Sequence, residues 1–164
     1  MGLYERELKE LTNTGVKYVV VGAVALALHN HPRFTIDLDI LPDLSESNLG
    51  QLIKVMTKLG YISRIPVDVN ELKDPKKREV WYTEKNMKVF TFIHPKQHKD
   101  SVDVMIYPAV SFEEADSKKI YGDIEGIKVP VASLVDLLTL KNSAKRAKDL
   151  PDILTLERLL GGQI

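Results

Sequence analysis

The sequence predicts an α+β fold, in which a mixed β-sheet is flanked by helices and followed by a helical tail. Three observations predict it. Short β-branched runs alternate with amphipathic segments, no internal repeat occurs, and no linker or low-complexity stretch divides the 164 residues. A chain of this length can bury a sizeable core. We therefore expect one domain over residues 1–164, with its core over about 16–107 and its helical part over about 131–164.

In the first half of the chain, apolar runs are separated by turn and cap signals. The expected elements are a helix over residues 3–11, a strand over 16–21, a helix over 23–28, a strand over 35–41 and a helix over 45–59. Gly15 and Gly22 end the first two elements, and Pro32 separates the third from the fourth. Ser45 or Ser47 is expected to cap the last helix.

The second half alternates between strand-like pieces and two closing helices. The expected strands cover residues 61–65, 78–83, 87–93 and 101–107, with a short pair around 120 and 127–129, and the expected helices cover 133–141 and 150–160. Residues 84–86 are expected to form a hairpin turn between the second and third strands. The aromatic residues of that hairpin are expected to pack in the core rather than to stack on bases, and they are Trp81, Tyr82, Phe90 and Phe92.

Composition limits the possible functions. Lys and Arg together number 23, as do Asp and Glu, so no overall charge draws the chain to nucleic acid or membrane. The absence of cysteine excludes disulfides, thiolate metal sites and cysteine nucleophiles. The first residues lack the basic and then apolar pattern of a signal peptide, and no run approaches transmembrane length. Cytoplasmic residence and no membrane partner are expected, and the sequence indicates no particular oligomeric state.

Two aspartates on one predicted strand are the most informative feature. Asp37 and Asp39 alternate with Ile36, Leu38 and Ile40, so both carboxylates are expected on one face of the strand. Neighbouring carboxylates repel each other unless a cation lies between them. Magnesium that bridges the phosphates of a nucleotide is the usual occupant of such a site. The pattern therefore favours nucleotidyl transfer.

A third carboxylate, Asp103, alternates in the same way with Val102 and Val104. If its strand lies beside that of Asp37 and Asp39, the three carboxylates converge and two magnesium ions about 3.5–4 Å apart can be held. Asp103 would then lie on the acceptor side and act as the general base. The alternative is that Asp103 faces solvent on an edge strand. The paired aspartates make this alternative the weaker one.

Residues near the two aspartates each have two interpretations. At Gly22 a strand turns into a helix, and the free N–H groups and helix dipole there suit a phosphate, although a plain tight turn needs the same glycine. Arg33 is placed to contact phosphate or to pair with Asp43 or Glu46. Thr35 has the same two-residue spacing as the aspartates, so it is expected on their face.

Two parts of the chain resemble a known family. Residues 20–25 (Val-Val-Gly-Ala-Val-Ala) and residues 33–39 (Arg-Phe-Thr-Ile-Asp-Leu-Asp) resemble the signature of the polymerase β-like nucleotidyltransferase superfamily. More narrowly, they resemble its stand-alone branch related to AbiEii toxins. Residues 137–141, which end in a lysine, and residues 146–152, which read Arg-x-Lys-Asp-x-x-Asp, are similar to later motifs of that branch. The similarity extends over about 16–156, with a poorly matched middle.

The resemblance implies a nucleotidyltransferase fold and a magnesium-dependent enzyme that uses a nucleoside triphosphate such as ATP. The residues to which it assigns roles are Gly22 at the triphosphate, Asp37, Asp39 and Asp103 at magnesium, Lys141 at phosphate, and Asp149, which completes the site. In the related toxins the acceptor is a tRNA end or a protein side chain, and an antitoxin is a possible partner. The chain departs from the pattern at Ala23, since a second glycine or a serine is usual there and alanine offers no hydroxyl.

The tail residues also have alternative interpretations. Lys141 shares a helix face with Leu137 and is expected to point inward, toward a bound triphosphate or a core aspartate. Asp149 is equally well placed to be the N-cap of the last helix, because Pro151 fits the first turn. Lys145, Arg146 and Lys148 form a basic cluster that is either a solvated loop or a contact for the phosphates of an RNA acceptor.

Two classes of function remain open at this point. We favour an enzyme that moves a nucleoside monophosphate from a triphosphate to an acceptor hydroxyl on an RNA end or a protein side chain. The alternative is a catalytically weak nucleotide-binding or antitoxin-like interaction module with the same fold, in which Ala23 lowers turnover. Transfer of label that Asp37→Ala abolishes would support the enzyme, whereas binding without transfer would favour the module.

Overall fold

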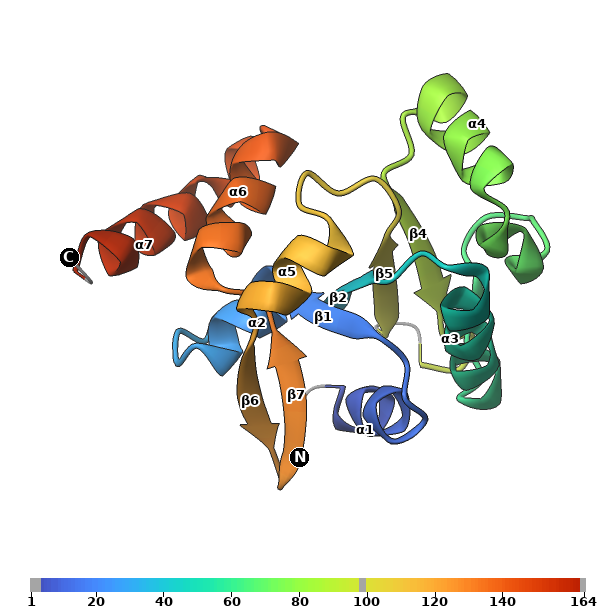
Figure 1. Ribbon diagram of the computed structural model, residues 1–164, viewed down its shortest axis with the longest axis horizontal. Helices are drawn as coiled ribbons and strands as arrows, with labels where there is room; N and C mark the ends of the chain where they lie inside the picture. The colour runs from blue at the N-terminus through green and yellow to red at the C-terminus, as the bar shows by residue number, and fades with distance from the viewer. Residues whose placement is uncertain (1–3, 98–99, 163–164) are drawn as a thin grey trace.

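A mixed sheet lies at the centre of the molecule (Figure 1). The structure, a computed structural model, describes residues 4–97 and 100–162. In that part of the chain seven strands pair in the order β3-β4-β5-β2-β1-β7-β6. The strands are β1 (Tyr18–Val21), β2 (Asp37–Pro42), β3 (Ile62–Ser63), β4 (Val89–Ile93), β5 (Ser101–Met105), β6 (Ile120–Ile124) and β7 (Ile127–Val131). The predicted α+β class with a mixed sheet is confirmed.

Helices surround this sheet. The α-helices are α1 (Glu5–Asn13), α2 (Gly22–Leu28), α3 (Glu46–Lys58), α4 (Pro75–Lys85), α5 (Phe112–Lys118), α6 (Leu134–Ala144) and α7 (Leu150–Gly161), and two 3-10 helices are η1 (Val69–Lys73) and η2 (Ala147–Asp149). Figure 1 shows α6 and α7, in orange and red, on the opposite side of the molecule from α3 and α4. Within the described ranges, no helix has both the length and the apolar character needed to cross a bilayer.

The pairing of the central strands positions the site. β2 is antiparallel to β1 and parallel to β5. The register places Asp39 opposite Asp103, and it places Asp37 opposite Ser101. Because β5 lies between β2 and β4, Asp103 is on an inner strand and not at an edge of the sheet.

The face opposite these aspartates is part of the core. Leu38, Ile40, Val102 and Val104 are all fully buried. Burying an apolar side chain of this size stabilises the fold by about 1.5–3 kcal/mol. A one-residue slip of register would turn the aspartates into this core, so the hydrophobic pattern fixes which face of the sheet carries the carboxylates.

The structure corrects the expected strand over residues 78–83 and the expected turn over 84–86. Most of this stretch lies in α4, which Asp74 caps by accepting a hydrogen bond from the Lys76 N–H at 2.9 Å. Asn86 ends the helix with a left-handed φ of 51°. The aromatic content favoured a strand, but an N-cap aspartate followed by proline is a start signal for a helix. The sequence also predicts no element where α5 and η1 lie.

Of the four aromatic residues expected in the core, three are buried. Trp81, Phe90 and Phe92 are buried as predicted. Tyr82 is different, since 37% of it is exposed and it is on α4 rather than on a hairpin strand. It stacks on Tyr107, with ring centroids 4.2 Å apart and ring planes 10° apart.

Candidate active site

Three carboxylates, which we call the acidic floor, lie on one face of the sheet. Asp37 and Asp39 are two residues apart on β2, and Asp103 is the register partner of Asp39 on β5. Since alternate residues of a strand share a face and register partners face the same way, all three side chains leave the sheet on the same side. Two parallel strands therefore place three negative charges close together.

Neutral hydroxyl groups hold two of the three carboxylates of the acidic floor. The Ser101 hydroxyl donates to Asp37 Oδ1 at 2.5 Å, and the Thr91 hydroxyl donates to Asp103 Oδ1 at 2.7 Å. The ion pairs found in the described part of the chain include none of the three aspartates. The carboxylates are positioned, but in these residues no basic side chain neutralises them by direct contact.

Burial and mutual repulsion change the acidity of the floor. Burial, followed by the charges of Asp103 and Asp37, raises the pKa of Asp39 to about 7, although the charge of Lys141 acts in the opposite direction. Burial also raises the pKa of Asp103, against the opposing effect of the hydrogen bond from Thr91. The protein therefore resists full ionisation of the floor, and a bound cation would relieve that resistance.

Gly22 is required by the floor itself. It begins α2 with a φ of +70°, which glycine adopts without steric cost. A Cβ at this position would collide with the carboxylate of Asp39. The neighbouring Ala23 is buried. The glycine thus lets the start of α2 lie against Asp39, which places the first backbone groups of that helix beside the floor.

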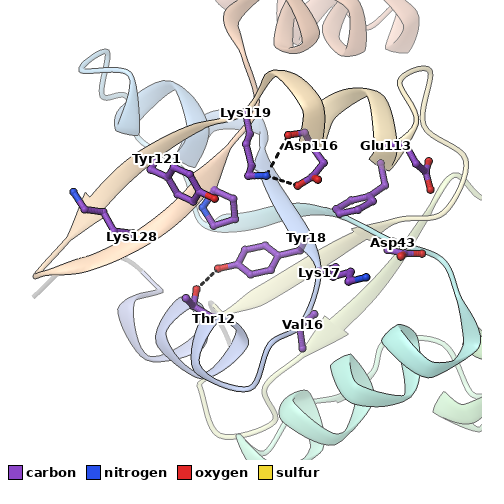
Figure 2. Close-up of a pocket in the computed structure, with 12 residues that line it drawn as sticks. Thr12, Val16, Lys17, Tyr18, Asp43, Glu113, Asp116, Lys119, Tyr121 and Lys128 are labelled. Carbon is purple, nitrogen blue, oxygen red and sulfur yellow. Dashed lines mark hydrogen bonds and ion pairs between the residues drawn. The ribbon is translucent and has the colours of Figure 1, made fainter.

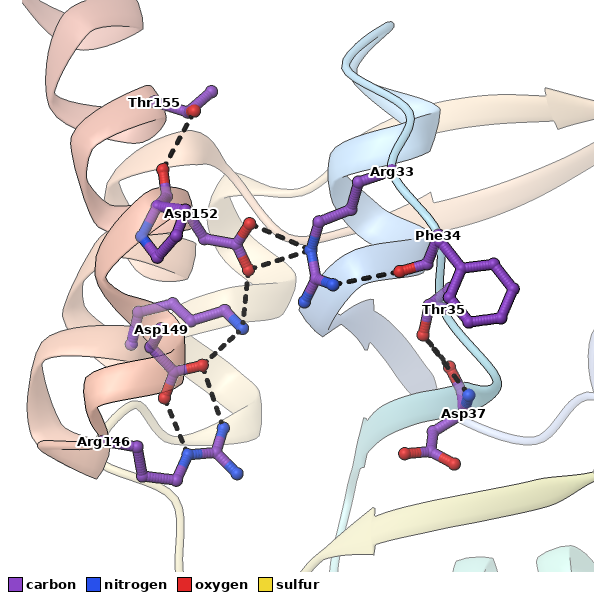
Figure 3. Close-up of polar contacts among 10 residues, drawn as sticks. Arg33, Phe34, Thr35, Asp37, Arg146, Asp149, Asp152 and Thr155 are labelled. Carbon is purple, nitrogen blue, oxygen red and sulfur yellow. Dashed lines mark hydrogen bonds and ion pairs between the residues drawn. The ribbon is translucent and has the colours of Figure 1, made fainter.

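A second cluster, which we call the ion-pair bridge, consists of Arg33, Lys141, Arg146, Asp149 and Asp152. Figure 3 shows Arg33 reaching Asp152 from the segment before β2, while Arg146 and Asp149 meet beside them. Lys141 Nζ lies 3.0 Å from Asp149 Oδ1 and 3.1 Å from Asp152 Oδ2. Arg146 Nε lies 2.7 Å from Asp149 Oδ2, and Arg33 Nε lies 2.9 Å from Asp152 Oδ1. The bridge ties α6 and α7 to the segment that leads into β2.

Asp149 belongs to the bridge and is not a helix cap. It occupies the N-cap position of α7, but its side chain makes no cap hydrogen bond. Burial acts to raise the pKa of Asp149, yet the hydrogen bonds from Arg146 and Lys141 outweigh it and hold that pKa below its ordinary value. The cap interpretation is therefore wrong, and the carboxylate serves to hold Lys141 and Arg146.

The contacts of Lys141 and Arg33 bear on two further expectations. Lys141 does meet core aspartates, which was one of its two interpretations. Arg33 pairs with Asp152 and not with Asp43 or Glu46. Sequence reasoning missed this role of Asp152. The available signal was its position three residues after Asp149, since that spacing places both carboxylates on one face of a helix.

Thr35 lies outside the strand alternation. β2 begins at Asp37, so the two-residue period that predicted a shared face does not extend back to Thr35. Its hydroxyl donates to the Asp37 carbonyl at 3.2 Å and accepts from the Asp37 N–H at 3.3 Å. These are long bonds, and their effect is local, since they brace the entry of the chain into β2.

One cavity of about 120 Å³ joins the acidic floor to the ion-pair bridge. Asp39 and Asp103 line it from the floor, Lys141 and Arg146 line it from the bridge, and Gly22 lines it at the start of α2. Residues that the sequence singled out on three separate segments therefore face one space. Asp37, Ala23, Arg33 and Thr35 are not among its lining residues.

A larger hollow of about 470 Å³ lies elsewhere, between α1, α5 and the β6–β7 pair (Figure 2). Lys119 is paired there with Asp116 at 2.7 Å and lies 5.8 Å from the ring centroid of Tyr121. No residue of the acidic floor or of the ion-pair bridge lines it. The hollow brings together none of the residues that the sequence singled out for chemistry, so the candidate active site is the smaller cavity.

The acidic floor fits a magnesium ion by the chemistry of its donors. Its oxygen ligands are hard and negatively charged, which is what Mg²⁺ prefers, and the charge of Lys141 offsets their repulsion only in part, since the pKa of Asp39 stays raised. In the ranges that the structure describes, no group of three or more His, Asp or Glu side chains, the acidic floor included, forms a cage that could hold a metal ion by itself. Mg²⁺ seldom uses such a cage, because it keeps waters and binds through one or two carboxylates together with substrate phosphates.

Comparison with known proteins agrees with this geometry. The family model described as nucleotidyl transferase AbiEii toxin, Type IV TA system, matches residues 8–163. Comparison with curated proteins by sequence gave no match.

Several solved structures share the fold. The antibiotic-resistance factor ANT(2'')-Ia is 14% identical, with a TM-score of 0.64 over 98% of this chain and 84% of that one. The lincosamide antibiotic adenylyltransferase LnuA is 14% identical, with a TM-score of 0.60 over 93% and 92%. A putative nucleotidyltransferase from Thermotoga maritima is 16% identical, with a TM-score of 0.54 over 96% and 90%. At such identities the likeness shows the fold alone, and it is a nucleotidyltransferase fold.

Proposed function

Since the chain belongs to the AbiEii family of nucleotidyltransferases, we propose that it moves a nucleoside monophosphate from a nucleoside triphosphate to an acceptor hydroxyl, with magnesium. The acceptor is an RNA end or a protein side chain. The observation that supports this most strongly is the acidic floor, with three carboxylates on one face of β2 and β5, of which Asp39 and Asp103 line one cavity together with Lys141.

Each residue has a role in this proposal. Asp37, Asp39 and Asp103 hold magnesium, two ions in all, through their carboxylate oxygens. When bound, the metal offsets phosphate charge and promotes ionisation of the attacking hydroxyl. Gly22, which lines the cavity at the start of α2, lies against the triphosphate.

Lys141 is the candidate phosphate contact on the bridge side. An ammonium group has three N–H donors, and Asp149 and Asp152 account for two of them. One donor therefore remains for a phosphate oxygen while the two carboxylates keep the side chain in place. Because Lys141 is only 11% exposed, the contact would form in a largely desolvated site where charge–charge attraction is strong.

The transfer step is an in-line displacement at the α-phosphorus. A bond forms from the acceptor oxygen to that phosphorus, and the bond from the phosphorus to the pyrophosphate oxygen breaks. The proton of the attacking hydroxyl passes to Asp103.

Labelled nucleotides provide the test. The protein is incubated with magnesium, total RNA or a protein extract, and ATP, CTP, GTP or UTP labelled at the α-phosphate. We expect label on RNA or protein with the wild type and none with Asp37→Ala. Glu113→Ala, which removes an exposed carboxylate far from the floor, is the control and should keep full activity. Equal labelling by the Asp37→Ala variant would overturn the proposal.

The departure at Ala23 supports a second candidate, a nucleotide-binding or antitoxin-like module with little turnover. This module would bind nucleotide with magnesium but transfer no label in the same assay. The family description names a toxin of a toxin–antitoxin system. We extend the enzyme proposal to that role, with an antitoxin as partner, and we expect expression to arrest growth of the host, whereas expression of Asp39→Asn should not.

A further inference from the structure

A second hollow, of about 460 Å³, adjoins the cavity of the acidic floor. We call it the outer cleft. Five residues line both spaces, and they include Met105 at the end of β5 and Arg146 of the ion-pair bridge. A molecule in the outer cleft would therefore lie next to the carboxylates. Of its lining residues, the sequence analysis offered only Arg146 as a contact for an RNA acceptor, and the proposed function gives the cleft no role.

The wall of the outer cleft combines flat aromatic surface with positive charge. Tyr82 and Tyr107 form the stacked pair described above, and Tyr82 is exposed although it is a large aromatic residue. Lys88 and Arg146 also line the cleft. Among the described lining residues there is no Asp or Glu. Exposed aromatic rings with nearby cations are the features that bind single-stranded nucleic acid.

We propose that the outer cleft binds the acceptor, which is the end of a single-stranded RNA. A base near that end stacks on the Tyr82–Tyr107 pair, and its backbone phosphates lie near Lys88 and Arg146. This inference rests on the proposed function and selects RNA from its two classes of acceptor. A polycationic acceptor is disfavoured, because the cleft presents cations and no carboxylate to it.

The order of the residues across the sheet indicates why the acceptor, and not the base of the triphosphate, occupies this cleft. Gly22 follows β1, Asp39 is on β2, Asp103 is on β5, and the outer cleft lies beyond β5 toward β4. The attacking and leaving oxygens must be roughly in line. If pyrophosphate leaves on the side of Gly22, the attacking hydroxyl arrives from the side of Asp103, where the outer cleft is.

RNA binding without catalysis tests the inference. The probe is a short single-stranded RNA of mixed sequence with a fluorescein label, followed by fluorescence anisotropy without triphosphate. We expect Tyr107→Leu to weaken binding about 10–100-fold, since a stacking platform is lost. Tyr107→Phe keeps the ring and should bind as the wild type does. Lys88→Ala should weaken binding and also lower its salt dependence, because a phosphate contact is removed.

Steady-state kinetics show whether the outer cleft binds a base of the RNA acceptor or the base of the triphosphate. With an RNA acceptor, we expect Tyr107→Leu to raise the KM for RNA and to leave the KM for the triphosphate unchanged. A raised KM for the triphosphate alone would assign the outer cleft to the nucleotide and overturn the inference. So would wild-type RNA binding by a folded Tyr107→Leu variant, shown to be folded by circular dichroism, or a protein acceptor whose labelling Tyr107→Leu leaves unchanged.

The proposed function and this inference fail separately. If the wild type transfers no label but binds RNA in a way that depends on Tyr107, the outer cleft is a nucleic-acid site on a chain without the proposed activity. If Asp39→Asn abolishes transfer while Tyr107→Leu changes neither RNA binding nor KM, the enzyme stands and the inference is wrong.

Discussion

The acidic floor and the ion-pair bridge face the same cavity, yet their electrostatics are opposite, because the floor holds like charges together and the bridge pairs unlike ones. The floor gathers three carboxylates, of which Asp37 and Asp103 accept hydrogen bonds from hydroxyl groups, and burial with repulsion raises the pKa of Asp39 to about 7. The bridge alternates three cations with two carboxylates, and every one of them has an opposite partner. There the pKa of Asp149 is lowered.

The difference separates a part of the site whose charges repel one another from a part whose charges are paired within the protein. The bridge is neutralised internally except for one excess positive charge, so it can hold α6 and α7 in place before substrate arrives. The floor is the reverse, because its repulsion is relieved only by protons or by a cation. Stability is given up where function needs charge, and it is recovered in the adjoining structure.

Removing the central cation of the bridge should have the largest effect. In Lys141→Met, two buried carboxylates lose their shared partner, so we expect the free energy of unfolding to fall by about 3–5 kcal/mol. Urea denaturation followed by circular dichroism measures it. Lys145→Met, which removes an exposed lysine four residues further along, is the matched control and should change stability little. A stable Lys141→Met variant would mean that the bridge does not hold the helices.

Removing a carboxylate of the floor should lower the transfer activity. Asp39→Asn keeps the shape but removes a charge that, in the proposed function, positions metal and phosphates, so we expect transfer to fall by about 10²–10³-fold or more. Label transfer at saturating triphosphate measures it. Asp43→Asn, just beyond β2, is the matched control, and it should retain activity because Asp43 lies outside the floor. Comparable losses of transfer activity in both variants would show that activity does not depend specifically on the floor.

The two clusters should also respond oppositely to pH when metal is absent. The pKa of Asp39 in the folded state is above its ordinary value of 3.8. Its contribution to the free energy of unfolding is therefore present below about pH 4 and is lost as the pH rises toward 7. We expect a loss of about 2–4 kcal/mol over this window. The pKa of Asp149 in the folded state is lowered. Its contribution to the free energy of unfolding is therefore present above about pH 4 and is lost as the pH falls below that value.

Urea midpoints measured across pH check both slopes. Asp39→Asn should flatten the profile between pH 4 and 7, and Asp149→Asn should flatten it below pH 4. The predicted contrast is wrong if Asp39→Asn changes the slope below pH 4 and Asp149→Asn changes it between pH 4 and 7.

Removing the charge of Asp152 from the bridge should have a smaller effect on the transfer activity. Asp152 acts through Lys141 and Arg33, so it is a positioning residue, and we expect Asp152→Asn to lower kcat about 10–100-fold, as removal of outer-shell partners does elsewhere. Asp152→Glu should restore part of the loss. Arg33→Met should cost less, because Arg33 is 45% exposed and its pair is screened by solvent. A variant with an unchanged kcat and a raised acceptor KM would contradict this role.

The smallest effect is expected at Ala23. Ala23→Ser adds a hydroxyl beside the start of α2, and one added neutral hydrogen bond is worth about 1 kcal/mol. We therefore expect the KM for the triphosphate to fall by a few-fold with little change in kcat. No change in KM, or a rise, would show that the hydroxyl does not reach the phosphates from this buried position.

The unit of β1, α2 and β2 was predictable because its signals are local. The two-residue alternation of Asp37 and Asp39 with apolar residues fixes their common face, and Gly22 marks the turn before them. α4 was not predicted, because Val80, Trp81 and Tyr82 favour a strand, whereas the helix is set by Asp74 and the proline after it.

The rest of the site depends on contacts between distant segments. Arg33 and Asp152 are 119 residues apart, and no local pattern pairs one arginine with one aspartate over such a separation. Tyr82 and Tyr107 meet only because α4 ends beside β4 and the chain after β5 passes it. Family resemblance supplied Lys141 and Asp149 as site residues, but only the structure gives their partners.

The thermal stability of Asp39→Asn, with and without magnesium, tests the central claim most directly. At pH 8 without metal, the account predicts that this variant melts several degrees above the wild type, since a repelling charge is gone. It also predicts that magnesium with a triphosphate raises the melting temperature of the wild type and leaves that of the variant almost unchanged. A variant that melts below the wild type and still responds fully to magnesium and triphosphate would contradict the account.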